Sequence, residues 1–173
     1  MMLLPNDARH YALRSGVCAV LLVLSFVFLG KPRIRLSFSD FAWGILAGIA
    51  VFFLWIAPEY LGFGTGALKG DSPFDPKVCG WPLTVARLAG SAFVIAAAEE
   101  LFFRKWLVNF AGFWWMVALF AIEHDRWAVG ALAGIVYGLL AMKKGLACAI
   151  VAHMTTNFIL GLLVILMGSW QFW

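Results

Sequence analysis

The chain has 173 residues, of which 64% are hydrophobic and only 13% are charged, with a formal net charge of +4. Soluble domains carry about 25% charged residues, so this composition excludes an ordinary soluble protein. The modest positive charge gives no reason to expect a nucleic-acid partner. We therefore expect one integral-membrane domain over residues 1–173, because the length is that of a single domain.

Two apolar runs in the first half, at residues 17–29 and 41–57, predict the first two membrane-spanning helices. Basic residues follow the first run directly, without a small-residue cleavage pattern, so we interpret it as a retained span rather than a signal peptide. Pro58 is expected to end the second helix. The glycines and prolines after it predict a loop up to residue 81, so residues 1–81 comprise two spans and a loop.

Four further helices are predicted in residues 82–173. The first of them begins near Pro82, and the others are expected at residues 114–124, 127–142 and 146–167. The fold class is thus an all-α, polytopic transmembrane helical bundle of about six spans. The fourth and fifth helices are shorter than the roughly 20 residues that cross a bilayer, and we expect them to be broken or partly re-entrant.

Basic residues predict how the bundle is oriented. They gather at the connections that follow the first, third and fifth helices. The positive-inside rule then places these connections in the cytoplasm and both termini outside. The residues concerned are Lys31, Arg33, Arg35, Arg104, Lys105, Lys143 and Lys144.

Glu99, Glu100 and Arg104 form a polar cluster within an apolar helix. Glu100 and Arg104 are four residues apart with the acid first, which is the better order for an ion pair. Glu99 points about 100° away and has no such local partner, which suits a general base. The alternative is a helix end at the interface with a solvated face. Because an ionisable group in a bilayer costs at least a few kcal/mol, we favour a functional site.

Two further clusters contain histidine. His153 and Asn157 lie one turn apart on one helix face, where both could donate hydrogen bonds to an oxyanion. The alternative is an interhelical hydrogen-bonded pair that stabilises the bundle. His124 follows Phe120 by four residues, and it could equally be a simple loop residue.

The depth of the clusters in the membrane decides whether they can share a cavity. At ~1.5 Å rise per residue, Glu99 and His153 lie roughly 8 and 14 Å from the same side of the bundle. His124 reaches a comparable depth only if the third helix continues past Arg104 to about residue 110, so that the fourth begins near Gly112. A third helix that ended at Arg104 would put His124 on the far side.

The three clusters, in this order on successive helices, resemble one known family. Glu-Glu-x-x-x-Arg, Phe-x-x-x-His and His-x-x-x-Asn look like the motifs of the CAAX prenyl protease and bacteriocin-processing (CPBP) family of intramembrane endopeptidases, here as a small bacterial-type member. The resemblance covers residues 86–163, and all three motifs are intact. The one departure is Lys105, where many family members have glycine.

The resemblance implies a role for each polar residue. Glu99 would be the general base of a glutamic-type protease, and His124 would help to hold and polarise the attacking water. His153 and Asn157 would stabilise the tetrahedral oxyanion.

Supporting roles fall to Glu100 and Arg104, which would brace the helix and orient the catalytic glutamate. Residues 82–173 would then form a catalytic helical core. The resemblance implies a metal-free mechanism without a cofactor. Two glutamates and two histidines leave a divalent metal open, although no His-Glu-x-x-His pattern is present on one helix.

Three functions are compatible with these residues. The leading prediction is an intramembrane endopeptidase of the bacterial inner (cytoplasmic) membrane, whose partners are the lipid bilayer and a membrane-associated protein or peptide substrate such as a sorting tail or a secreted peptide. The alternatives are a non-enzymatic immunity or scaffold protein of the same fold and a small proton-coupled carrier. The intact polar residues weigh against a pure binder, and the absence of inverted repeats weighs against a carrier.

Overall fold

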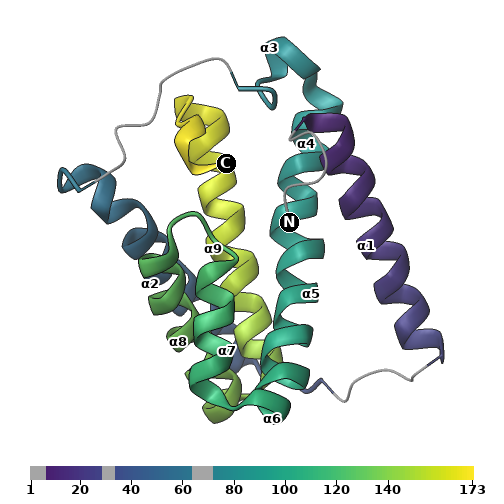
Figure 1. Ribbon diagram of the computed structural model, residues 1–173, viewed down its shortest axis with the longest axis vertical. Coiled ribbons are helices and arrows are strands. Elements are labelled where there is room, and N and C mark those ends of the chain that lie inside the picture. The colour runs from purple at the N-terminus through teal and green to yellow at the C-terminus, as the bar shows by residue number, and fades with distance from the viewer. Residues whose placement is uncertain (1–6, 29–33, 64–71) are drawn as a thin grey trace.

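Helices make up all the regular structure that the computed structural model describes, which comprises residues 7–28, 34–63 and 72–173. The long helices stand roughly side by side as a bundle (Figure 1). Five of them are long and apolar enough to cross a membrane. The predicted all-α, polytopic membrane fold is confirmed, and the chain is an integral membrane protein.

The first two spans are longer than the apolar runs that predicted them. They are α1 (Ala8–Phe28) and α2 (Phe38–Tyr60). Pro58 lies inside α2, in its last turn, so the expectation that it ends the helix was wrong. Proline removes one N–H donor there, but the ladder resumes at once, since the N–H of Leu61 donates to the carbonyl of Ala57 at 2.9 Å.

The predicted loop at residues 59–81 contains one short helix. Residues 64–71 lie outside the described part of the chain, and α3 (Pro76–Cys79) forms a single turn after them. The Asp75 carboxylate caps this turn by accepting a hydrogen bond from the N–H of Lys77 at 2.7 Å. The chain therefore enters the third span through a capped turn.

The third span is one continuous helix of 31 residues, Trp81–Ala111. In order, its segments are α4 (Trp81–Ala89), η1 (Gly90–Ile95), α5 (Ala96–Glu100), η2 (Leu101–Leu107) and α6 (Val108–Ala111). Both η segments are π-helical, a rare winding that occurs frequently at functional sites. Gly112 ends the helix with a φ of +87°, which glycine adopts readily. The helix thus reaches the length that a shared cavity requires.

The fourth predicted span is a short helix that stops part of the way across. α7 (Phe113–Ile122) has 10 residues, which at ~1.5 Å each cover about half of the roughly 30 Å apolar thickness of a bilayer. The prediction of about six spans was therefore too high, because within the described residues only five helices qualify. The turn after α7 lies near mid-height of the molecule (Figure 1).

The last part of the chain returns from this turn and crosses again. α8 (Trp127–Lys144) runs from mid-height to the lower end of the view in Figure 1, and α9 (Leu146–Met167) crosses the whole bundle. A short 3₁₀ turn, η3 (Trp170–Phe172), follows. The hairpin of α7 and α8 therefore fills only one end of the bundle.

Small residues allow α2 to pack closely against α9. A Cβ atom on Gly44 would lie 2.8 Å from Cβ of Val151, and one on Gly48 only 2.5 Å from the carbonyl oxygen of Ala152. Small residues four positions apart are typical of close helix pairs in membranes. This packing brings the backbone of α2 against the part of α9 that carries His153.

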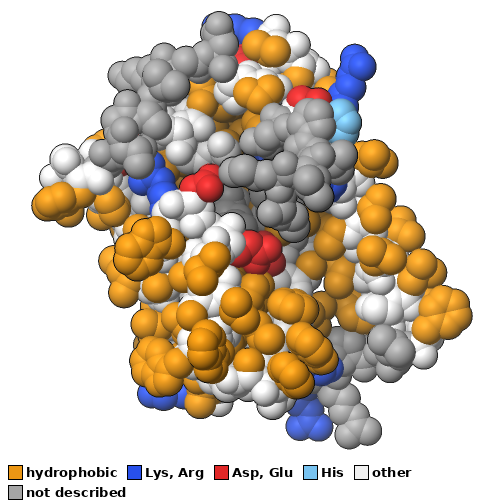
Figure 2. Space-filling model, in the orientation of Figure 1, with side chains coloured by type: hydrophobic (Ala, Val, Ile, Leu, Met, Phe, Trp, Pro, Cys, Tyr) orange, Lys and Arg blue, Asp and Glu red, His pale blue; other side chains and the backbone are white. Residues whose placement is uncertain are grey.

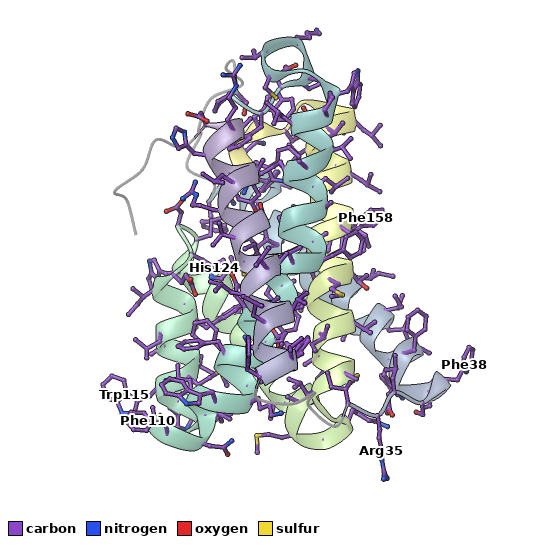
Figure 3. All side chains as sticks on the ribbon, turned by 90° about the vertical axis from the view of Figure 1, so that its right-hand side faces the viewer. Arg35, Phe38, Phe110, Trp115, His124 and Phe158 are labelled. Carbon is purple, nitrogen blue, oxygen red and sulfur yellow. The ribbon has the colours of Figure 1, made fainter. Side chains whose placement is uncertain are left out.

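The outer surface suits a lipid environment. Figure 2 shows a broad hydrophobic area over the lower half of the molecule, with basic side chains beneath it. Phe38, Phe110 and Trp115 project away from the bundle (Figure 3) and are 88%, 81% and 67% exposed. Aromatic side chains of this kind are enriched where a protein meets the membrane interface.

The basic residues that predict the orientation do not all lie at connections between helices. Four of them are exposed, namely Arg35, Lys105, Lys143 and Lys144. Arg104 is buried instead, because the third span continues beyond it. Lys31 and Arg33 lie outside the described residues. The orientation in the membrane stays a prediction.

Candidate active site

The carboxylate of Glu100 is completely buried and has partners on two helices. Its Oε1 lies 3.0 Å from Nη1 of Arg104 on the same span and accepts a hydrogen bond from Nδ1–H of His153 on α9 at 2.8 Å. The side chains of Glu100 and Arg104 are 0% and 1% exposed. The ion pair expected from their spacing is present, and a histidine from the facing helix completes it. Charges buried this deeply need such partners, because desolvation costs several kcal/mol per ion.

Aromatic rings surround Arg104 on its other sides. Its guanidinium carbon lies 4.1 Å from the ring centroid of Phe120 and 5.6 Å from those of Phe103 and Tyr137. Cation–π contacts of this kind stabilise a desolvated cation. Arg104 is therefore a buried structural partner of Glu100.

Glu99 is the carboxylate that reaches the cavity. Its side chain is 17% exposed, and its Oε2 lies 3.7 Å from Nε2 of His153. Because Nδ1 of His153 is occupied by Glu100, Nε2 is the ring nitrogen left to face Glu99. This separation is too long for a direct hydrogen bond, but one water oxygen can lie at about 2.8 Å from both atoms.

The imidazole of His153 is held by a second set of contacts. The Tyr137 ring stacks on it, with centroids 4.8 Å apart and an interplanar angle of 19°. The Tyr137 hydroxyl donates to Oγ1 of Thr156 at 2.8 Å, and the Thr156 hydroxyl donates to the carbonyl of Gly48 at 2.8 Å. Since both hydroxyls and the His153 side chain are buried, these bonds fix the ring against α2 and α8.

His124 lies on the turn after α7, inside the bundle and near mid-height (Figure 3). Its Nδ1–H donates to the backbone carbonyl of Phe120 at 2.8 Å, which leaves Nε2 free to accept. The rings of Phe120 and Trp55 lie 4.6 and 5.4 Å from its own. The spacing of Phe120 and His124 thus reflects a one-turn backbone hydrogen bond that sets the tautomer of the imidazole.

Asn157 has a partner that its pairing with His153 does not predict. Its Nδ2 donates to the backbone carbonyl of Ser91 at 3.1 Å, across from α9 to the third span. Ser91 belongs to the π-helical segment η1, a winding that occurs frequently at functional sites. The amide is thereby oriented, and its second N–H stays available to a ligand.

These side chains line one cavity of about 370 Å³. Glu99, His124, His153 and Asn157 all contribute to its wall, so the structure brings together the four residues predicted to act on a substrate. Glu100 and Arg104 lie behind the wall, where they were expected to brace the helix. The remaining lining residues are Tyr11, Arg14, Ser15, Trp55, Arg87, Ser91, Ile95, Phe120, Glu123, Ala133, Tyr137, Thr156, Leu160, Phe172 and Trp173.

Several of these lining residues were not predicted from the sequence. Tyr137 is the only hydroxyl-bearing residue between residues 127 and 142, and that isolation was a signal for a buried hydrogen bond. Thr156 lies within the His153 to Asn157 motif and could have been included with it. Trp55 carried no local signal, because an aromatic residue in an apolar span is ordinary.

No metal centre is formed by the described residues. Among residues 7–28, 34–63 and 72–173, no three His, Cys, Asp or Glu side chains converge closely enough to hold a metal ion. Two glutamates and two histidines left a metal open in the sequence. In the structure, Glu100 accepts a hydrogen bond from His153, Glu99 lies 3.7 Å from His153, and His124 donates to the carbonyl of Phe120. Metal independence stays a prediction.

Fold and site together define a polytopic membrane protein with a polar, acid- and imidazole-lined cavity inside a helical bundle. Residues 81–159 match the family described as type II CAAX prenyl endopeptidase Rce1-like. Neither a curated protein nor a solved structure matches the chain. The matched segment contains all six of the predicted site residues, from Glu99 to Asn157. The match supports the family that the three motifs predicted and indicates a CAAX-type intramembrane protease in general terms.

Proposed function

We propose that this protein is a glutamic-type intramembrane endopeptidase, in which Glu99 activates water against a peptide bond of a membrane-associated protein or peptide. The observation that carries the proposal is the 3.7 Å approach of Glu99 to Nε2 of His153. Both groups line a cavity to which His124 and Asn157 also contribute. The match to the protease family over residues 81–159 supports the same reading.

The proposed reaction is a direct hydrolysis through a tetrahedral intermediate. Glu99 takes a proton from water as the water oxygen attacks the carbonyl carbon, while His124 holds and polarises that water. The carbonyl π electrons move onto oxygen, and His153 and Asn157 donate hydrogen bonds to the resulting oxyanion. Glu99 then gives its proton to the amide nitrogen as the C–N bond breaks.

Glu100 and Arg104 are proposed to act through other residues. The hydrogen bond from His153 to Glu100 fixes one imidazole nitrogen and directs the other toward the cavity. Both nitrogens of an imidazolium donate, so Nε2 can serve the oxyanion while Nδ1 stays bound to Glu100. Arg104 balances the buried charge of Glu100 and lets it perform this task.

We further propose that residues 82–173 form the catalytic helical core and that the first two spans complete its cavity. Tyr11 of α1 and Trp55 of α2 support this division, since both line the cavity without belonging to a motif. The bacterial inner membrane is the proposed location, and the bilayer and a membrane-associated substrate are the proposed partners.

Two glutamates of the same cavity allow a matched test. Glu99→Gln and Glu123→Gln each remove one carboxylate from the lining, but only Glu99 approaches His153. The full chain in proteoliposomes would be incubated with a mass-encoded library of single-span peptides, and the products identified by mass spectrometry.

We expect cleavage by the wild type and by Glu123→Gln, and a loss of at least about 1,000-fold for Glu99→Gln, because the general base and its proton transfer are removed together. All three proteins should melt at similar temperatures in detergent. Wild-type turnover by a folded Glu99→Gln protein would refute the role of Glu99. If the wild type cleaves no peptide of the library, the result would favour the alternative of a non-enzymatic immunity or scaffold protein.

A further inference from the structure

The cavity extends from the catalytic glutamate along one face of the third span. Arg87, Ser91, Ile95 and Glu99 recur every four residues on that helix, and all four line the cavity. Twelve residues separate Arg87 from Glu99, which is at most ~18 Å along the helix axis at the 1.5 Å rise of an α-helix, because the π-helical segment η1 between them rises less per residue. Arg14 of α1 lines the cavity as well. The proposed peptidase site therefore continues into an elongated cavity that carries two arginines beyond it.

Aromatic rings lie beside both arginines, and they do not neutralise the positive charge. The guanidinium carbon of Arg87 lies 3.8 Å from the ring centroid of Tyr11, 4.7 Å from that of Phe74 and 5.5 Å from that of Trp173. Arg14 approaches the same Tyr11 ring at 5.9 Å. Two cations therefore lie around one aromatic ring, held in place by cation–π contacts.

Neither arginine is paired with an acid in the part of the chain that is described. No ion pair there involves Arg14 or Arg87, and the Nε atoms of both are buried without a hydrogen-bond partner. Glu99 and Glu123 line the same cavity but are not bonded to either arginine. Two neighbouring cations in a poorly solvated site repel each other, and an anion placed between them lowers that energy.

We propose that Arg14 and Arg87 bind a carboxylate of the substrate peptide, up to about five residues along the chain from the bond cleaved at Glu99. An extended peptide covers ~3.3–3.6 Å per residue, so ~18 Å corresponds to about five residues. The carboxylate is either the free C-terminus or an Asp or Glu side chain, since both present the same two oxygens to a guanidinium. A lipid phosphate fits less well, because both arginines line the cavity that holds Glu99. This inference rests on the proposed function, because it places the carboxylate relative to the bond cleaved at Glu99.

The test measures binding and not cleavage, so the two proposals fail independently. The full chain carrying Glu99→Gln, in phosphatidylcholine nanodiscs, would be exposed to random octapeptide pools with either free or amidated C-termini, and the retained peptides counted by mass spectrometry. A second comparison would use amidated pools that contain Asp or Asn at one position.

We expect at least about a tenfold preference for the carboxylate in one of the two comparisons, because charge-assisted hydrogen bonds to a guanidinium are stronger than those to a neutral amide. Adding Arg14→Gln or Arg87→Gln should remove the preference, and Arg87→Lys should retain part of it. Arg9→Gln is the matched control, since Arg9 is exposed on the same helix as Arg14 and should leave the preference unchanged.

The outcomes that overturn the proposal are equally defined. Equal retention of carboxylate and amide pools in both comparisons would overturn it, as would a preference that survives both arginine substitutions. Binding of phosphatidylglycerol in nanodiscs that depends on Arg87, with no preference among peptides, would assign the arginines to lipid instead. If Arg87→Gln fails to fold, Arg14→Gln replaces it, and the wild-type arginines are tested by competition. Acetate should displace the retained carboxylate peptides and acetamide should not, and equal displacement by the two would overturn the proposal.

Discussion

Nδ1 of His153 lies 2.8 Å from Oε1 of Glu100, a contact between residues 53 positions apart in the chain. This contact distinguishes Glu100 from its neighbour Glu99. Glu100 is occupied by its hydrogen bond from His153 and its ion pair with Arg104. Of the two adjacent glutamates, only Glu99 lines the cavity. The two adjacent glutamates therefore have different surroundings, and substitutions at the two positions should have different consequences.

Removing Arg104 should destabilise the protein. Arg104→Ala would leave the buried charge of Glu100 with His153 as its only partner among the described side chains, and breaking a buried pair costs about 3–5 kcal/mol. We expect a clear fall in melting temperature in detergent together with a loss of cleavage. Lys105→Ala, at the exposed neighbouring position, should change neither. An unchanged melting temperature for Arg104→Ala would contradict the pairing.

An ion pair near the cavity should control the position of His124. Nη2 of Arg126 lies 2.8 Å from Oε2 of Glu59, which ties the turn after α7 to the end of α2. Because a shift of about 1 Å can cost about 100-fold in rate, Arg126→Gln should lower kcat about 10- to 100-fold with little change in melting temperature.

The reversed pair, Glu59→Arg with Arg126→Glu, supplies the control for that experiment. If the tether acts by holding the turn, exchange of the two charges should restore most of the lost rate. A rate that stays at the wild-type value in Arg126→Gln would show that the turn holds its place unaided.

Close packing of α2 on α9 should be sensitive to a single methyl group. The Cβ of Gly48→Ala would lie 2.5 Å from the carbonyl of Ala152 and 2.6 Å from Cβ of Thr155. Overpacking of this kind costs about 1–3 kcal/mol, and we expect a lower melting temperature in detergent. Gly16→Ala is the matched control, because no atom lies within 4 Å of the added Cβ there. Equal melting temperatures for the two variants would exclude tight packing at Gly48.

Chelation should leave activity intact. In the proposed mechanism Glu99 is the base and imidazole and amide groups stabilise the oxyanion, so no step requires a divalent ion. After exhaustive dialysis against EDTA, we expect turnover within about twofold of the untreated protein. Loss of activity that zinc specifically restores would overturn the metal-independent mechanism.

The apolar runs were sufficient to predict the all-helical fold, because a lipid environment leaves a chain few other ways to satisfy its backbone. They were insufficient for the exact ends of helices. Pro58 was expected to end α2, but one missing donor in a last turn is tolerated. The short α7 was predicted to be the fourth of about six spans, since hydropathy alone does not say where a turn will lie inside the bundle.

The site was predictable as far as local spacing carries information. Three pairs of residues are one-turn neighbours. Phe120 with His124 and His153 with Asn157 line the cavity, and Glu100 with Arg104 forms the ion pair behind its wall. The hydrogen bond from His153 to Glu100 and the stacking of Tyr137 on His153 join separate helices. Contacts between helices depend on how the bundle packs, and one sequence does not record that.

The half-length α7 has a consequence for the shape of the cavity. Its turn lies near mid-height, and the cavity continues beyond it toward the end of the bundle that holds α4 and η3, where Arg87, Phe172 and Trp173 line it. On the opposite side the interior is closed by tightly buried side chains, namely Phe103, Leu107, Met116 and Val117. Among the described residues, the cavity thus extends toward one end of the bundle, while apolar side chains fill the other end.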